Sequence, residues 1–122
     1  DEVWKRLEAL IWLPEGWDGY QGTHVSLQNA NFALRVLEAI CGIAARAPQI
    51  VPGPAGDLQI EWHTLQGDLE IHILKPNNLH AWRAMAHGDP EGEELFLRND
   101  FTMLAQWVKE ITERPVAARA AA

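Results

Sequence analysis

Histidine and glutamate side chains alternate in one short stretch of this 122-residue chain and could do chemistry together. Glu61 and His63 lie two residues apart, and Glu70 and His72 repeat that spacing a few residues later. Residues two apart in a β-strand point to the same side, so each pair shares one face. If the two strands are neighbours, two imidazoles and two carboxylates could bind a transition metal or transfer protons.

The same four side chains also fit ordinary cross-strand pairs on a solvated sheet surface, which contribute roughly 0.2–1 kcal/mol each. A metal centre needs groups that hold its ligands from behind, and a flat sheet provides few of them. We therefore expect structural pairing at these four positions, with no metal ion and no cofactor. The other histidines lack the spacing of a known ligand motif: His24, His80 and His87.

Nucleophilic catalysis has weaker support. Ser26 stands at an expected helix start and has no G-x-S-x-G context. Cys41 falls on the apolar face of the same helix, where an unreactive buried thiol is expected. The chain has neither a P-loop nor a G-x-G-x-x-G motif. An enzyme is therefore less favoured than a binding protein.

The stretch from Asp57 to Lys75 predicts a β-hairpin that would position the histidines and glutamates. Its alternating pattern is typical of strands with one buried face, and the apolar members are Leu58, Ile60, Trp62, Leu69, Ile71 and Ile73. Gln66-Gly67 is the expected turn, because glycine readily adopts positive φ. That turn predicts four facing pairs: Trp62 with Ile71, Ile60 with Ile73, His63 with Glu70, and Glu61 with His72.

A third strand is expected from Leu79 to His87, after a turn at Asn77-Asn78. Antiparallel pairing through this turn predicts that Trp82 and Ala84 join the buried face. Arg83 would then lie beside the histidines and glutamates on the solvated face.

Apolar residues at helical spacing predict helices over 2–13 and 26–47, and from a cap at Asn99 or Asp100 to about Glu113. Each is expected to end at a proline, namely Pro14, Pro48 and Pro115. Residues 48–56 are expected to be an extended connector. Trp12 lies off the apolar stripe of the first helix, and we expect it to pack under the following loop.

These elements predict a two-layer α+β fold in the order α-α-β-β-β-(β)-α. A three- to four-stranded antiparallel meander would carry the helices on one face, with 94–98 as the optional edge strand. The expected core joins the helices to the sheet through Val36, Ile40, Leu104, Trp62, Ile71, Ile73 and Trp82. Residues 1–114 are expected to form a single domain, and 115–122 a flexible alanine-rich tail.

Composition narrows the classes of partner. The formal net charge is −7 and Lys and Arg form no cluster, which argues against nucleic acid. No apolar run approaches membrane-spanning length, so no membrane partner is expected. The single cysteine excludes an internal disulfide and fits a cytoplasmic location.

Residues 14–25, PEGWDGYQGTHV, predict a loop with aromatic rings on both sides of an Asp-Gly turn. The favoured interpretation is that Trp17 and Tyr20 cover the edge of the core. The alternative is a recognition loop around Trp17, Asp18 and Tyr20, because aromatic loop residues make good binding anchors.

Several segments resemble a group of small uncharacterised bacterial proteins. They are LPEGWDGY, a following helix, PQIVPGPAG, LQIEW and GDLEIHI, spanning roughly residues 7–75. The group's pattern is LP-x-GWDGYGA, a helix, P-x-I-x-P-x-x-x-G, a strand ending in LEW and a second strand of LEI type. This chain departs from it at residues 20–23, where Tyr-Gln-Gly-Thr replaces Tyr-Gly-Ala. The resemblance implies no activity and no catalytic residue.

We expect a small acidic protein-binding module, of the inhibitor, antitoxin or immunity type, acting on another bacterial or phage protein. The expected binding residues are the loop and sheet side chains Trp17, Asp18, Tyr20, Glu61, His63, Glu70, His72 and Arg83. One alternative is a small metal-dependent or acid–base enzyme that uses the histidine and glutamate face. Another is a homodimeric structural module joined through an edge strand or the open sheet face.

Overall fold

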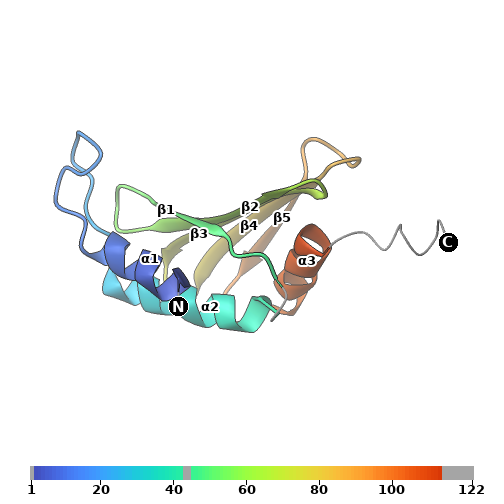
Figure 1. Ribbon diagram of the computed structural model, residues 1–122, viewed down its shortest axis with the longest axis horizontal. Helices are drawn as coiled ribbons and strands as arrows, with labels where there is room; N and C mark the ends of the chain where they lie inside the picture. The colour runs from blue at the N-terminus through green and yellow to red at the C-terminus, as the bar shows by residue number, and fades with distance from the viewer. Residues whose placement is uncertain (1, 43–44, 114–122) are drawn as a thin grey trace.

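The computed structural model describes residues 2–42 and 45–113 (Figure 1). Over these residues the predicted α+β class is confirmed, with three helices and one antiparallel sheet of five strands. In chain order the elements are α1 (Glu2–Ile11), α2 (Leu27–Ile40), β1 (Gln49–Pro52), β2 (Leu58–Thr64), β3 (Gly67–Lys75), β4 (Asn78–Met85), β5 (Glu93–Leu97) and α3 (Thr102–Thr112).

The sheet is a simple meander in which each strand pairs with the next along the chain, from β1 to β5. All three helices lie on one side of it (Figure 1). The core therefore forms between the helices and one sheet face. No described helix or strand covers the other face, so the side chains on it meet solvent (Figure 1).

The alternating pattern of the hairpin assigns its buried face correctly. Its six apolar side chains are at most 2% exposed. Val36 and Ile40 of α2 and Leu104 of α3 belong to the same buried cluster, as predicted. Trp107 of α3 is also buried, although its position was not included in the expected core.

The hairpin register differs from the prediction by two residues. Thr64 pairs with Gly67, so the turn is Leu65-Gln66 and not Gln66-Gly67. Gly67 lies inside the ladder, and this position requires glycine because a Cβ there would be only 2.3 Å from the Ala84 carbonyl oxygen of β4. A shift of two keeps every side chain on its face but changes its neighbours. The facing pairs are Ile60 with Ile71, Trp62 with Leu69, Glu61 with Glu70, His63 with Asp68, and Gln59 with His72.

The predicted facing of β4 is wrong, because a bulge interrupts the β3–β4 ladder between Ile73 and Lys75. The extra residue, Leu74, reverses which β4 side chains point to the helices. Leu79 and Ala81 are therefore in the core. The side chains of Trp82 and Ala84 lie on the open side, opposite Glu70 and Asp68, and Arg83 lies on the helix side, opposite Leu69.

The expected connector also contributes to the sheet, since Gln49–Pro52 forms β1 against β2. The edge strand expected over 94–98 is present as β5. Together they bring the meander to five strands, against the three to four expected.

The helix ends differ from the prediction. α1 ends at Ile11, and Trp12 is 79% exposed, so it does not pack under the loop as expected. α2 ends at Ile40 and not at residue 47, because Cys41 already has extended backbone angles. The Cys41 thiol is half-buried and burial raises its pKa, which disfavours a thiolate nucleophile. The expected tail, 115–122, lies outside the described residues.

Within the described residues, none of the helices has both the length and the apolar character required to cross a membrane.

Replacing Ile71, which is fully buried, with alanine is expected to lower the free energy of unfolding by about 2–5 kcal/mol. Leu65→Ala is the matched control, because that side chain is 95% exposed in the β2–β3 turn and its loss leaves no cavity. Urea denaturation of both variants measures the difference. Equal midpoints for Ile71→Ala and the unmodified chain would contradict the assigned facing.

Candidate functional site

The open face of the sheet brings together most of the chemically active side chains. We use this name for the β1–β5 side chains that point away from the helices. Cross-strand register arranges them in four rows. The rows are Val51, Gln59, His72, His80 and Phe96; then Gln49, Glu61, Glu70, Trp82 and Glu94; then His63, Asp68 and Ala84; and, at the end of β3, Lys75 and Asn78.

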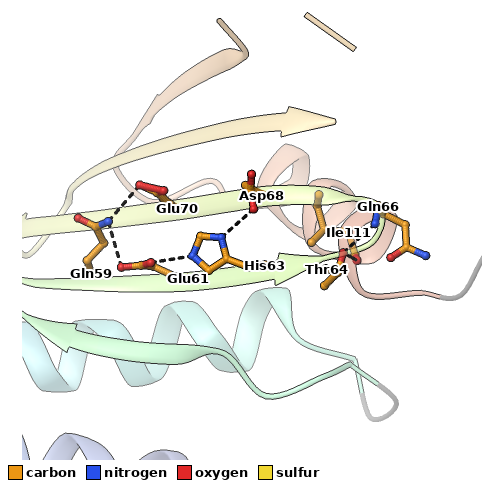
Figure 2. A network of polar contacts seen from close by, with 8 residues as sticks. All are labelled: Gln59, Glu61, His63, Thr64, Gln66, Asp68, Glu70 and Ile111. Carbon is orange, nitrogen blue, oxygen red and sulfur yellow. Dashed lines mark hydrogen bonds and ion pairs between the residues drawn. The ribbon is translucent and has the colours of Figure 1, made fainter. Parts of the chain in front are cut away.

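Three of the predicted residues meet in one hydrogen-bonded network on the open face, shown in Figure 2. Glu61 and Glu70 lie directly opposite each other on β2 and β3. The Gln59 amide donates to both of them, to Glu61 Oε2 and Glu70 Oε1, at 3.2 Å each. His63 extends the network, with Nε2 2.8 Å from Glu61 Oε1 and Nδ1 2.7 Å from Asp68 Oδ1.

The protonation of His63 follows from this geometry. A neutral imidazole has one N–H and can donate to only one carboxylate, whereas the protonated ring donates to both. The hydrogen bond with Glu61, and then the one with Asp68, therefore raise the pKa of His63 above its ordinary value. The ring and the carboxylates hold each other in place on an otherwise solvated surface.

His72 does not join this network as predicted, because it pairs with Asp57 at the end of the β1–β2 loop. His72 Nε2 is 2.6 Å from Asp57 Oδ2, and the Ala55 N–H donates to Oδ1 at 3.0 Å. Burial would raise the pKa of Asp57, but these hydrogen bonds outweigh it and hold the pKa below its ordinary value. The carboxylate also fills the space beside Gly53, where a Cβ would come within 2.2 Å of it.

Aromatic side chains occupy the other end of the open face. The His80 ring stacks on Phe96, with centroids 4.5 Å apart and planes inclined by 17°. His80 Nε2 is 3.1 Å from Glu94 Oε1, and the Phe96 side chain is 76% exposed. Trp82 is half-buried and its indole N–H donates to the Glu91 carbonyl at 2.9 Å. A flat, exposed ring pair therefore lies beside a carboxylate.

Arg83 was expected on this surface, but the bulge places it on the helix side. Its guanidinium pairs with Glu110 of α3 and with Glu93 of β5, and lies 4.5 Å from the centroid of the Trp107 ring. Arg83 thus connects the sheet to α3. The open-face positions consequently carry four carboxylates, from Glu61, Asp68, Glu70 and Glu94, and one cation, Lys75 at the end of β3.

The second predicted surface, the loop around Trp17, has a fixed backbone. The Asp18 carboxylate accepts hydrogen bonds from the N–H groups of Tyr20 and Gly22 at 2.9 and 3.0 Å, led by that of Tyr20, and these lower its pKa. The Trp17 indole N–H donates to the Thr23 carbonyl at 2.6 Å, and this ring is half-buried. Tyr20 is 85% exposed, so it does not cover the core as the favoured interpretation had it.

This loop is held against the β1–β2 loop by backbone hydrogen bonds. The Thr23 N–H donates to the Pro54 carbonyl at 2.9 Å, and the Ser26 N–H donates to the Gly56 carbonyl at 3.0 Å. The segments LPEGWDGY and PQIVPGPAG, separated by α2 in the sequence, therefore lead into loops that touch. The loop around Trp17 belongs to this end of the molecule and not to the open face.

Sequence reasoning missed several members of the site. Gln59 and Asp68 occupy alternating positions of the hairpin, so their side of the sheet could be read from the pattern, but their partners depend on the register. The stack of His80 on Phe96 requires the β4–β5 pairing and the bulge before β4. The sequence of Glu93–Leu97 gives no local signal that Phe96 lies on the solvated face, because Phe96 stands between two other apolar residues, Leu95 and Leu97.

Comparisons of this chain with protein-family models, with curated proteins and with solved structures find no match.

Acid should weaken the fold in part through Asp57. A carboxyl whose pKa is lower in the folded chain than in the unfolded chain stabilises the fold at neutral pH, and that contribution disappears as the pH falls below about 4. Asp57→Asn should be less stable at pH 7 and should lose less stability than the unmodified chain between pH 5 and pH 2.

The measurement is the free energy of unfolding from urea titrations across that range. Glu38→Gln, at an exposed position of α2, is the control for removing one carboxylate. An acid dependence of Asp57→Asn identical to that of the unmodified chain would show that the pair with His72 contributes nothing.

Proposed function

We propose that this chain is a small acidic protein-binding module, and that its open face binds a basic segment of another protein. The observation that carries the proposal is the composition of that face: four carboxylates and an exposed ring pair, against a single cation, Lys75 at the end of β3. Charge complementarity favours a cationic partner and disfavours an acidic one.

The two ends of the open face would contribute differently. The stacked rings of His80 and Phe96 offer a flat surface on which an arginine guanidinium can lie, while Glu94 beside them accepts its hydrogen bonds. The carboxylates of Glu61 and Glu70 are already oriented by Gln59 and His63, so little side-chain freedom is lost when a lysine or arginine binds them.

The charge of the whole chain supports the same partner chemistry. A net charge of −7 attracts a basic protein over distances of about a Debye length and speeds association at low salt. A partner whose own basic site is covered by this face would lose the use of that site. An inhibitor or immunity-type role is the specific form of the proposal.

The ring pair should carry much of the affinity. We expect peptides selected from a random dodecapeptide display library on the tag-free protein to be enriched in Arg and Lys. Phe96→Ala should weaken the best selected peptide by at least about 30-fold, the range of a binding hot spot. Glu70→Lys should lower mainly the association rate, and more so at low salt.

Surface plasmon resonance at two salt concentrations separates these effects, and Leu65→Ala, outside the open face, is the control. Selected peptides without basic residues would contradict the proposal. So would binding lost in Tyr20→Ala but kept in Phe96→Ala, which would move the site to the Trp17 loop. Self-association abolished by Phe96→Glu would instead make a second copy of the chain the occupant.

A further inference from the structure

We propose that Glu61, His63 and Glu70 form a binding site for one divalent transition-metal ion, Zn²⁺ or Co²⁺, with Asp68 orienting the histidine. Each of the three residues offers one ligand atom, and these atoms lie within 4.8 Å of one another. The set combines one imidazole nitrogen with two carboxylate oxygens, which are ordinary zinc ligands. The site lies in the network of Figure 2 and shares Glu61 and Glu70 with the proposed protein-binding face, so an ion and a basic segment would compete for these two carboxylates. Its test uses metal ions alone and does not depend on the protein-binding role.

His63 has the arrangement found in metal-binding histidines. Such a ring usually donates its second N–H to a carboxylate, which fixes the tautomer and makes the other nitrogen a better ligand. Asp68 Oδ1 lies 2.7 Å from His63 Nδ1 and can accept that N–H. The free lone pair then belongs to Nε2, the atom that faces Glu61 at 2.8 Å. Asp68 is a positioning residue in this scheme and does not touch the ion.

The electrostatics of the cluster favour a cation. Glu61 and Glu70 are directly opposed across two strands, an arrangement that is destabilising for like charges. In the metal-free chain the hydrogen bonds of the Gln59 amide and the contact of His63 Nε2 with Glu61 relieve this repulsion. A divalent ion bound at Nε2 would neutralise both carboxylates. Gln59 would keep its hydrogen bonds to the outer side of the carboxylates and so hold them in place.

A cavity of about 220 Å³ adjoins the cluster, which leaves room for further ligands. Glu61 and His63 form part of its wall, together with Arg46, Ala47, Gln49 and Trp62. Three protein ligands leave a coordination position of a tetrahedral ion open. Water or a small anion could occupy that position, and the exposed Arg46 side chain would favour an anion there.

A metal ion at this site contradicts the sequence-based expectation that the histidine and glutamate face binds no metal. That expectation rested on a flat sheet offering no support to its ligands. The register of β2 on β3 supplies the support, since it brings Asp68 behind His63 and Gln59 beside both glutamates. His72 is bound to Asp57 and is left out of the ligand set.

The test is metal binding by tag-free protein after treatment with a chelator and dialysis. Calorimetric titration with Zn²⁺ should show one ion per chain, and Co²⁺ should give visible absorption bands of a protein-bound ion. His63→Ala should weaken Zn²⁺ binding at least about 10-fold, and Asp68→Asn should weaken it by about 10–100-fold, the usual effect of losing such a support. Glu61→Gln and Glu70→Gln should each weaken it too.

His87→Ala is the control, because that exposed histidine lies outside the open face and its loss should leave binding unchanged. Circular dichroism of each variant checks the fold, and the rise in Tm caused by Zn²⁺ should be present in His87→Ala and absent in His63→Ala. The proposal is overturned if neither ion binds saturably. It is equally overturned if His63→Ala binds as tightly as the unmodified chain, or if His72→Ala alone abolishes binding.

Discussion

The side chain of Asn29 ties together three parts of the chain on which the arrangement of the sheet depends. It is buried in α2, and its amide donates to the carbonyl of Gly56 in the β1–β2 loop and to that of Leu74 in the β3 bulge. The bulge sets which side of β4 faces the helices, and β5 follows from β4. The Asn29 amide thus connects α2 to the bulge at Leu74, and this bulge determines which β4 side chains lie on the open face.

The sequence allowed the facing of the hairpin to be predicted, but not its register. Alternation from Leu58 to Ile73 tells which side chains are buried, and a shift of two residues leaves that pattern unchanged. The register places Gly67 in the ladder, where its φ of +151° favours glycine and the approach of β4 leaves no room for a Cβ. That constraint comes from a third strand, so the hairpin sequence alone cannot reveal it.

The same limit applies to the candidate site. Glu61, His63 and Glu70 could be chosen from their types and spacing, because the alternating pattern of β2 and β3 places all three on the same face of the hairpin. The sequence could not reveal that Asp68 and Phe96 belong to the site, or that Arg83 lies on the helix side. Each of these placements depends on a strand pairing that the Leu74 bulge or the β2–β3 turn determines. A bulge adds one residue without a sequence pattern of its own.

The two edge strands of the meander, β1 and β5, limit the addition of strands from other copies of the chain. β1 is only four residues long and ends at Pro52, which has no N–H to donate, and Arg6 of α1 already binds the Ile50 carbonyl at 3.0 Å. At the other border, β5 carries adjacent acidic side chains at Glu93 and Glu94. Two copies brought together at β5 would place like charges side by side. Both edge strands therefore disfavour pairing with a strand of another copy, although the sheet is not closed into a barrel. This opposes the growth of fibres in which strands of successive copies extend the sheet.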